Sequence, residues 1–178
     1  MLKLPPQNLE AEESVLGALM VDKDAIFKVA DVLHPDDFYK PAHVTIGRAI
    51  FNLFEKHEPI DILSVTTKLK EAGLTQEVGG HSYLTKLIES VPTSAHINHY
   101  AKIVREKKIL RDLIHTSGQI SEEAFNPSGD VDQMLDGIEQ KIFSISQRSI
   151  TQRFINIKDE LHLAYERIEK LHQGEGRL

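Results

Sequence analysis

The residues that could do chemistry fall into two groups, and neither has the spacing of a working site. His96 and His99 lie three positions apart on an expected helix, a spacing that metal sites use. No third ligand is evident, so we interpret them as solvated histidines. The carboxylates lie at expected turns and helix N-termini, where acidic residues are favoured for structural reasons, so their positions do not indicate a catalytic role. Their clusters are Glu10, Glu12 and Glu13, then Asp22 and Asp24, then Asp36 and Asp37.

Several kinds of catalytic site are excluded by the sequence itself. There is no Gly-x-x-x-x-Gly-Lys-Ser or Gly-Lys-Thr loop to hold a nucleotide phosphate, and Gly79-Gly80 is followed by His81-Ser82 without a lysine. The chain has no cysteine, so thiolate metal sites and disulfides are ruled out. No serine sits in a nucleophile-elbow pattern. We therefore predict no catalytic residue and no cofactor or metal site in this chain.

The composition describes a globular, acidic chain. Its 178 residues are 40% apolar and 27% charged, and the formal net charge is −6. That balance opposes duplex binding, which usually needs a basic face. The first six residues lack the apolar run of a signal peptide, and no apolar span is long enough to cross a membrane. We expect a cytoplasmic protein with no membrane partner.

Periodicity predicts an all-α fold that starts with a small bundle of short helices. Apolar residues recur at helical spacing, and no stretch alternates as a strand would. The expected cap is Asn8 for the first helix, and Gly73 fits the end of the fourth. We expect helix 41–56 to be the central one. The expected helices cover residues 9–21, 24–33, 41–56, 61–72 and 82–90, within a globular subdomain at 1–92.

A long α-hairpin follows at residues 93–150. Between Pro92 and Pro127 lies one uninterrupted helix of about 30 residues, or about 45 Å, which Thr93 or Ser94 can cap. The sequence Asn-Pro-Ser-Gly at 126–129 predicts a turn, and Asp130 is the expected cap of the second arm. Apolar residues on both arms recur in the steps of a coiled-coil seam. The predicted interface set is Tyr100, Ile103, Leu110 and Ile114 on the first arm and Leu135, Ile138, Ile142 and Ile145 on the second.

The first arm also carries a second apolar stripe, formed by Ile109, Leu113 and Ile120. A two-helix hairpin can bury only one of the two stripes. The surplus indicates either dimerisation of the hairpin or packing against the bundle, and the sequence leaves both open.

The C-terminal part, residues 151–178, reads as a linker with a separate amphipathic helix. After a polar break, apolar residues again recur in steps of four and three. An isolated helix of this length is marginal in water, so the stripe needs a docking surface elsewhere. Its predicted docking residues are Ile157, Leu161, Ala164, Ile168 and Leu171. The glycine-rich end is typical of an interdomain linker, and we expect the natural protein to continue.

Residues 61–90 permit a second interpretation, as a helix-turn-helix or winged-helix-like DNA-binding module. In the expected reading helix Lys86 is offset by Glu89, and no arginine is present to reach guanine edges. This alternative predicts salt-dependent duplex binding, whereas the acidic charge predicts none.

Several short segments together resemble one family. Residues 4–12 and 14–17, the run Asp36-Asp37-Phe38-Tyr39 and the following Pro41-Ala42-His43 are similar to bacterial replicative DNA helicases of the DnaB family. The resemblance continues through residues 59–61, 79–84, 91–93, 100–101, 103–107 and 110–114, in order and over nearly the whole chain.

The resemblance implies a role beyond the residues themselves. It implies that this chain is the N-terminal domain and linker of a hexameric helicase that unwinds duplex DNA at the replication fork with ATP. Hairpins would pair between subunits, and six copies would form a collar as a trimer of dimers. The primase's C-terminal helicase-binding domain would dock on this collar, and a helicase loader is a further expected partner.

The same resemblance places the enzyme activity outside this chain. The linker helix would pack on a neighbour's ATPase domain. ATP, magnesium and DNA would bind only in that missing motor domain, so the fragment itself would be no enzyme. The remaining alternative is a stand-alone adaptor that binds primase or a loader without joining a ring.

Overall fold

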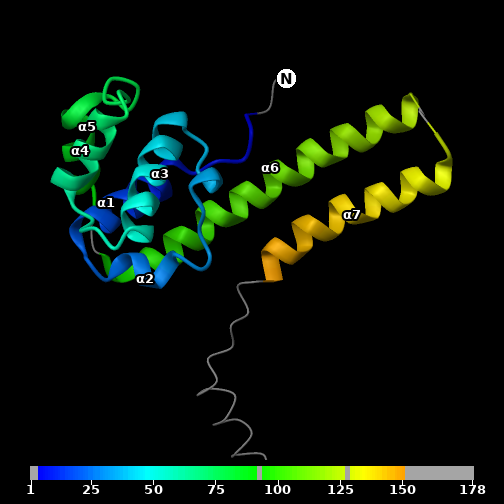
Figure 1. Ribbon diagram of the computed structural model, residues 1–178. Coiled ribbons are helices and arrows are strands. Elements are labelled where there is room, and N and C mark those ends of the chain that lie inside the picture. The colour runs from blue at the N-terminus through cyan, green and yellow to red at the C-terminus, as the bar shows by residue number, and fades with distance from the viewer. Residues whose placement is uncertain (1–3, 92–93, 127–128, 151–178) are drawn as a thin grey trace, which may run out of the picture.

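The computed structural model describes residues 4–91, 94–126 and 129–150, and every regular element in these ranges is helical (Figure 1). The predicted all-α class is therefore confirmed. Five short helices form a rounded bundle, from which α6 extends and α7 returns beside it (Figure 1). The α-helices are α1 (Leu9–Val21), α2 (Ala25–Val29), α3 (Pro41–Glu55), α4 (Ile62–Glu71), α5 (Gly80–Glu89), α6 (Ile97–Phe125) and α7 (Val131–Ile150). Two 3₁₀ turns complete the order, η1 (Pro35–Asp37) before α3 and η2 (Ser94–His96) before α6.

The helix ends follow from local side-chain chemistry. The Asn8 side chain accepts a hydrogen bond from the backbone N–H of Ala11 at 3.0 Å, so the predicted cap of α1 is confirmed. Asp61 caps α4 in the same way, through the Ser64 N–H at 2.8 Å. Just after α4, Gly73 has φ 72°, a left-handed conformation that glycine adopts without strain. The predicted glycine at the end of α4 is confirmed as well.

Some boundaries differ from the sequence prediction. α2 has only 5 residues and ends at Val29, whereas the prediction extended it to residue 33. Hydrogen-bonded turns connect Val29 to Leu33. α5 begins at Gly80, two residues earlier than expected, because Gly79 takes φ 89° and lets the chain turn into the helix. α6 begins at Ile97 and not at the predicted cap, because one 3₁₀ turn precedes it, as is frequent at helix starts.

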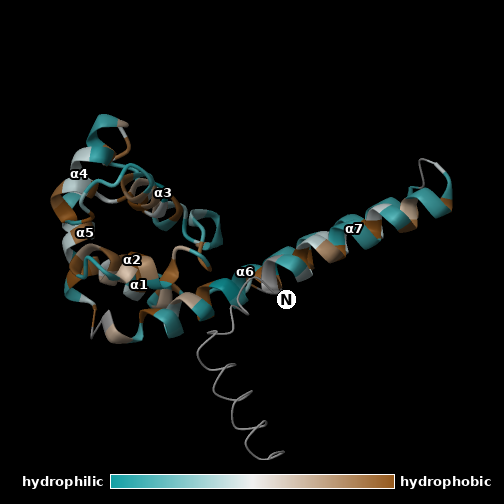
Figure 2. Ribbon diagram, turned by 60° about the horizontal axis from the view of Figure 1, so that its bottom comes forward, coloured by the Kyte–Doolittle hydropathy of each residue, from teal (hydrophilic) through white to brown (hydrophobic). Residues whose placement is uncertain are grey.

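The central helix is α1, and the expectation that helix 41–56 would be central is wrong. α1 packs against α3, α5 and α6 and is buried on several sides. Its small residues allow this enclosure. A Cβ at Gly17 would lie 2.2 Å from the carbonyl oxygen of Leu87 in α5, so the two helices are in backbone contact there. In Figure 2, hydrophobic residues recur along the short helices of the bundle, which contribute most of the hydrophobic core.

The first turns of α6 complete the core of the bundle. Ile97, Ala101 and Val104 are at most 1% exposed and belong to the same hydrophobic cluster as α1. Beyond them α6 leaves the bundle, and α7 packs along this outer part (Figure 1). One continuous helix thus belongs both to the core and to the hairpin.

Candidate functional site

The hairpin formed by α6 and α7 covers only one side of each arm. Thr116 and Ile145 are 8% and 9% exposed, and Ile120 and Ile138 are half-buried. An ion pair between Lys141 and Glu123 links the two arms. Several large apolar side chains of both arms remain exposed outside this contact.

The two arms together carry a set of exposed apolar side chains. Ile114 is 61% exposed, and Leu110, one helical turn before it, is 44% exposed. Groups of exposed apolar side chains often mark an interaction site in a soluble protein. The exposed apolar residues of the hairpin are Leu110, Leu113, Ile114, Phe125, Val131, Leu135, Ile142 and Phe143. We call this set the outer hairpin face.

The structure distributes the predicted interface residues over three places. Leu110, Ile114, Leu135 and Ile142 lie on the outer hairpin face. Ile138 and Ile145 are covered within the hairpin. The remaining two lie against the bundle instead.

Tyr100 and Ile103 pack against the bundle core and line a groove with residues of α1. Of the second stripe, Ile109 and Ile120 are half-buried and Leu113 is 37% exposed. Packing against the bundle, one of the two alternatives left open by the sequence, is therefore confirmed for the first part of α6, and dimerisation stays a prediction. The first part packs on the bundle, and the later part keeps surplus apolar surface. The predicted linker residues 157–171 lie outside the described residues.

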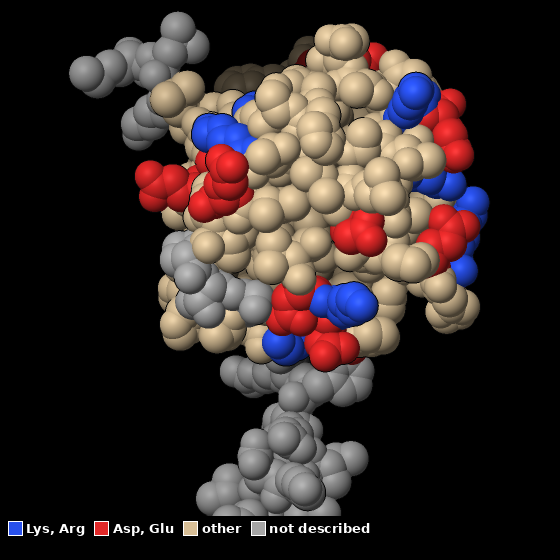
Figure 3. Space-filling model, turned by 90° about the vertical axis from the view of Figure 1, so that its left-hand side faces the viewer, with Lys and Arg blue, Asp and Glu red and all other residues tan. Residues whose placement is uncertain are grey.

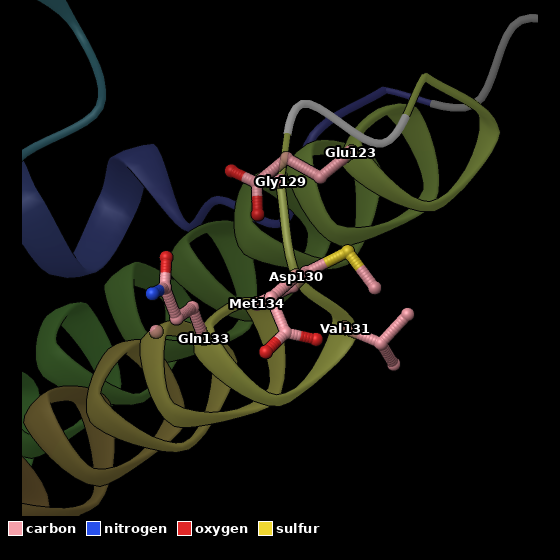
Figure 4. Close-up of a pocket in the computed structure, with 7 residues that line it drawn as sticks. Glu123, Gly129, Asp130, Val131, Gln133 and Met134 are labelled. Atoms are coloured by element: carbon pink, nitrogen blue, oxygen red, sulfur yellow. The ribbon is translucent and has the colours of Figure 1, made fainter.

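The hairpin tip forms a small pocket of about 250 Å³ between the arms (Figure 4). Glu123 from α6 faces Asp130, Gln133 and Met134 from the start of α7, and Gly137 completes the lining. The pocket is shallow and acidic, and its lining contains no nucleophile with an adjacent base. It offers no catalytic arrangement.

Two arginines fasten α6 to the bundle, and sequence reasoning missed both. Arg105 donates to Asp37 at 2.6 Å, and the two side chains are 6% and 3% exposed. Arg111 donates to the backbone oxygens of Asp37, at 2.6 Å, and Pro6, at 2.8 Å. No local signal in the sequence identifies them, because their partners lie 68, 74 and 105 positions away in the chain. Together they fix the angle at which α6 leaves the bundle.

A second polar cluster lies inside the bundle. The Glu12 carboxylate is 1% exposed and the His43 imidazole is fully buried, with 2.6 Å between Glu12 Oε2 and His43 Nδ1. The Tyr83 hydroxyl lies 2.7 Å from His43 Nε2. Burial, together with the nearby Glu13 carboxylate, raises the pKa of Tyr83 to about 12. Glu12 was assigned to a favourable helix N-terminus, and its place in the core was missed.

The described residues contain no cluster of three or more histidine and acidic side chains that could hold a metal ion. In the same part of the chain, no helix is both long and apolar enough to cross a membrane.

Known relatives agree on what this architecture is. The model for the DnaB-like helicase N-terminal domain matches residues 4–106. The replicative DNA helicase DnaC of Bacillus subtilis (strain 168) is 45% identical over 174 residues, and the replicative DNA helicase DnaB of Geobacillus stearothermophilus is 40% identical over 176. These alignments cover 98% and 99% of this chain but 38% and 39% of the relatives. The chain thus spans less than two fifths of their length.

Solved structures show the same fold. The N-terminal domain of DnaB helicase from Mycobacterium tuberculosis has a TM-score of 0.75 at 39% identity, covering 79% of this chain and 99% of that chain. A DnaB-like replicative helicase, described with its interactions with primase, has a TM-score of 0.67 at 23% identity and is a likeness of fold alone. That match covers 91% of this chain and 35% of the other. The chain belongs to the DnaB-like helicase N-terminal domain family.

Proposed function

We propose that this chain is the oligomer-forming collar of a hexameric replicative helicase. In this proposal, hairpins of two copies pair through the outer hairpin face, and three such dimers form the ring. The observation that carries the proposal is the exposed apolar surface on both arms, where Ile114, for example, is 61% exposed. An apolar side chain that stays in water does not stabilise the monomer, so this exposure favours an interaction site. Pairing of α-hairpins would bury that surface as a second helix layer.

The motor activity belongs, in this proposal, to parts of the parent protein outside this chain. The curated relatives are named replicative DNA helicases and are more than twice as long. ATP hydrolysis, magnesium binding and DNA unwinding would occur there. The predicted linker stripe at Ile157, Leu161, Ala164, Ile168 and Leu171 would join the collar to that motor by docking on a neighbouring subunit.

The collar would also receive the C-terminal helicase-binding domain of primase, and a helicase loader is a further partner in the proposal. One solved protein of the same fold is described with its interactions with primase. A binding assay between this chain and the isolated primase domain tests this part. Saturable binding supports it, and no binding at the highest soluble concentration contradicts it.

The DNA-binding alternative has little support on the surface. On the bundle face shown in Figure 3, Lys and Arg are few and stand beside Asp and Glu, without a continuous basic stripe. The formal net charge of −6 points the same way. The stand-alone adaptor differs from the collar in one measurable respect, because an adaptor would stay monomeric.

Light scattering across a concentration series tests the collar directly. We expect the mass to grow from a dimer toward a hexamer. Ile142, on the outer hairpin face, is 39% exposed in the single chain. The change Ile142→Asp places a charge there, and we expect the dimer Kd to rise at least about tenfold, since burying such a side chain is worth about 1.5–3 kcal/mol.

Leu63→Asp is the matched control. Leu63 is 72% exposed on α4, far from the hairpin in the fold, so the same substitution there should leave the mass unchanged. A wild-type chain that stays monomeric at every concentration would refute pairing through this chain. An Ile142→Asp chain with unchanged mass would remove the outer hairpin face from the interface.

A further inference from the structure

The polar cluster inside the bundle has a feature that a purely structural cross-link does not need. Glu12 and His43 are buried as completely as the leucines around them. They nevertheless connect, through the Tyr83 hydroxyl, to Glu13, whose side chain is 22% exposed. A continuous hydrogen-bonded chain therefore runs from the core to the surface.

At the inner end, Glu12 is surrounded by donors. Its Oε1 accepts from the backbone N–H of Tyr39 at 2.7 Å, and its Oε2 lies 3.4 Å from the Lys40 N–H and 2.6 Å from His43 Nδ1. Two of these partners are backbone N–H groups, which only donate, so the carboxylate acts as the acceptor. We therefore assign the hydrogen between Glu12 Oε2 and His43 Nδ1 to the imidazole, which donates to Glu12. This fixes the tautomer and leaves Nε2 to face Tyr83.

At the outer end, the Tyr83 hydroxyl has one hydrogen and two candidate acceptors. His43 Nε2 lies 2.7 Å away, and Glu13 Oε1 lies 3.3 Å away. Lys40 Nζ, at 2.7 Å, can only donate to the hydroxyl oxygen. The imidazole and phenol planes are within 13° of parallel with centroids 6.0 Å apart, which suits an in-plane hydrogen bond better than face-to-face stacking.

These contacts allow two complete hydrogen-bonding arrangements. With a neutral His43, the Tyr83 O–H donates to Nε2. The Glu13 carboxylate then pairs with Lys86, whose Nζ lies 3.7 Å from Glu13 Oε1. With a protonated His43, Nε2–H donates to the Tyr83 oxygen, and the Tyr83 O–H must turn to Glu13. The side-chain polar atoms of Glu12, His43 and Tyr83 each keep a partner in both arrangements.

We propose that Glu13, Tyr83 and His43 form a proton-coupled switch that carries the charge state of the buried imidazole to the surface. A proton taken from water by the Glu13 carboxylate passes to the Tyr83 oxygen as Tyr83 gives its own proton to His43 Nε2. Tyr83 ends as a neutral hydroxyl that donates to Glu13, and the imidazole gains one proton. Histidine is the side chain whose charge changes nearest to neutral pH.

The surface end of the switch opens into a groove. Glu13 lines a groove of about 330 Å³ together with Glu10 of α1 and Tyr100 and Ile103 of α6. When Tyr83 donates to Glu13, that carboxylate is less available to a cationic group in the groove. By reciprocity, a cationic group bound at Glu13 favours the neutral imidazole. The switch thus couples this groove, at the junction of α1 and α6, to the interior.

The charged and titratable groups that contact the cluster around His43 come from α1, from α5 and from the segment before α3. α1 provides Glu12 and Glu13, and the segment before α3 provides Lys40. α5 provides Tyr83 and Lys86. Protonation of His43 adds one buried positive charge, which the turned hydroxyl helps to stabilise.

Nitrogen-15 NMR of the histidine rings, with carbon-13 labelling of tyrosine Cζ, tests the proposal on the full 178-residue chain. We expect His43 Nδ1 to carry a hydrogen throughout the pH range. Nε2 should change from an acceptor nitrogen to an N–H as the pH falls, and the Tyr83 Cζ resonance should shift over the same interval. Exposed His99 of α6 serves as the internal reference.

Two variants separate the switch from simple packing. Tyr83→Phe keeps the ring and removes the relay, so proton exchange at His43 should slow markedly. Tyr100→Phe removes a hydroxyl from the same groove without touching the chain of contacts, and His43 should behave as in the wild type. An Nε2 that holds its hydrogen at every pH would overturn the proposal. So would equal proton exchange in the two variants.

Discussion

The buried ion pair between Arg105 and Asp37 gives the sharpest test of how α6 is held. Asp37 is 2% exposed, and each of its carboxylate oxygens has a donor, Arg105 Nη1 at 2.6 Å and the His34 N–H at 2.8 Å. The change Asp37→Ala leaves a guanidinium that is 5% exposed without this partner. Breaking a buried pair from one side costs about 3–5 kcal/mol.

That loss is large against the whole stability of a small domain, about 5–15 kcal/mol. Urea unfolding followed by far-UV circular dichroism measures it. The double variant Asp37→Ala with Arg105→Met removes the stranded charge and keeps an apolar side chain in its place. We expect the double variant to be more stable than Asp37→Ala alone, because the single variant keeps a buried guanidinium that has lost its carboxylate.

A neighbouring pair supplies the control. Asp36 lies 2.7 Å from Arg48, but the two side chains are 70% and 66% exposed. Exposed pairs contribute about 0–1 kcal/mol, so Asp36→Ala should change the unfolding free energy little. Equal losses for Asp36→Ala and Asp37→Ala would refute the argument that burial of the pair holds α6. Strict additivity in the double variant would also refute it.

Three further changes have directions fixed by local geometry. Gly17→Ala should lower the unfolding free energy by about 1–3 kcal/mol, because its Cβ would lie 2.2 Å from the Leu87 oxygen. Gly118→Ala meets nothing within 4 Å and should raise thermal stability by about 1 kcal/mol through helix propensity, as a melting curve would show. Asp61→Ala removes a helix cap worth about 1 kcal/mol at neutral pH. Because the Ser64 N–H lowers the pKa of Asp61 from 3.8, this contribution is present above 3.8 and fades as the pH falls through the folded value, so acid unfolding curves should converge.

The helices and their order could be predicted because their signals are local. Periodicity, the Asn8 cap and the glycine at 73 all act within a few residues, and each was found where expected. The boundary errors at α5 and α6 come from a left-handed glycine and a 3₁₀ turn, whose geometry no periodicity reports.

The interior partners could not be predicted, because they join residues far apart in the chain. Arg105 meets Asp37 across 68 positions, and His43 meets Glu12 across 31. A lone polar residue on a helix gives no sign of whether its partner is water or another side chain. The choice of α3 as the central helix failed for a related reason. Counting apolar residues favoured α3, but the small residues of α1 allow closer packing on several sides.

The sharing of α6 between core and hairpin sets how a collar built from this chain would transmit motion. Ile97, Ala101 and Val104 are locked in the bundle core, and Arg105 and Arg111 tie the next turns to the segment around Asp37. The outer part of the same uninterrupted helix carries the outer hairpin face. Because the helix is uninterrupted, the bundle can turn relative to its hairpin only if α6 bends. If hairpins pair as we propose, each pairing event therefore also restricts the orientation of two bundles, and we expect changes of collar shape to occur mainly between subunits.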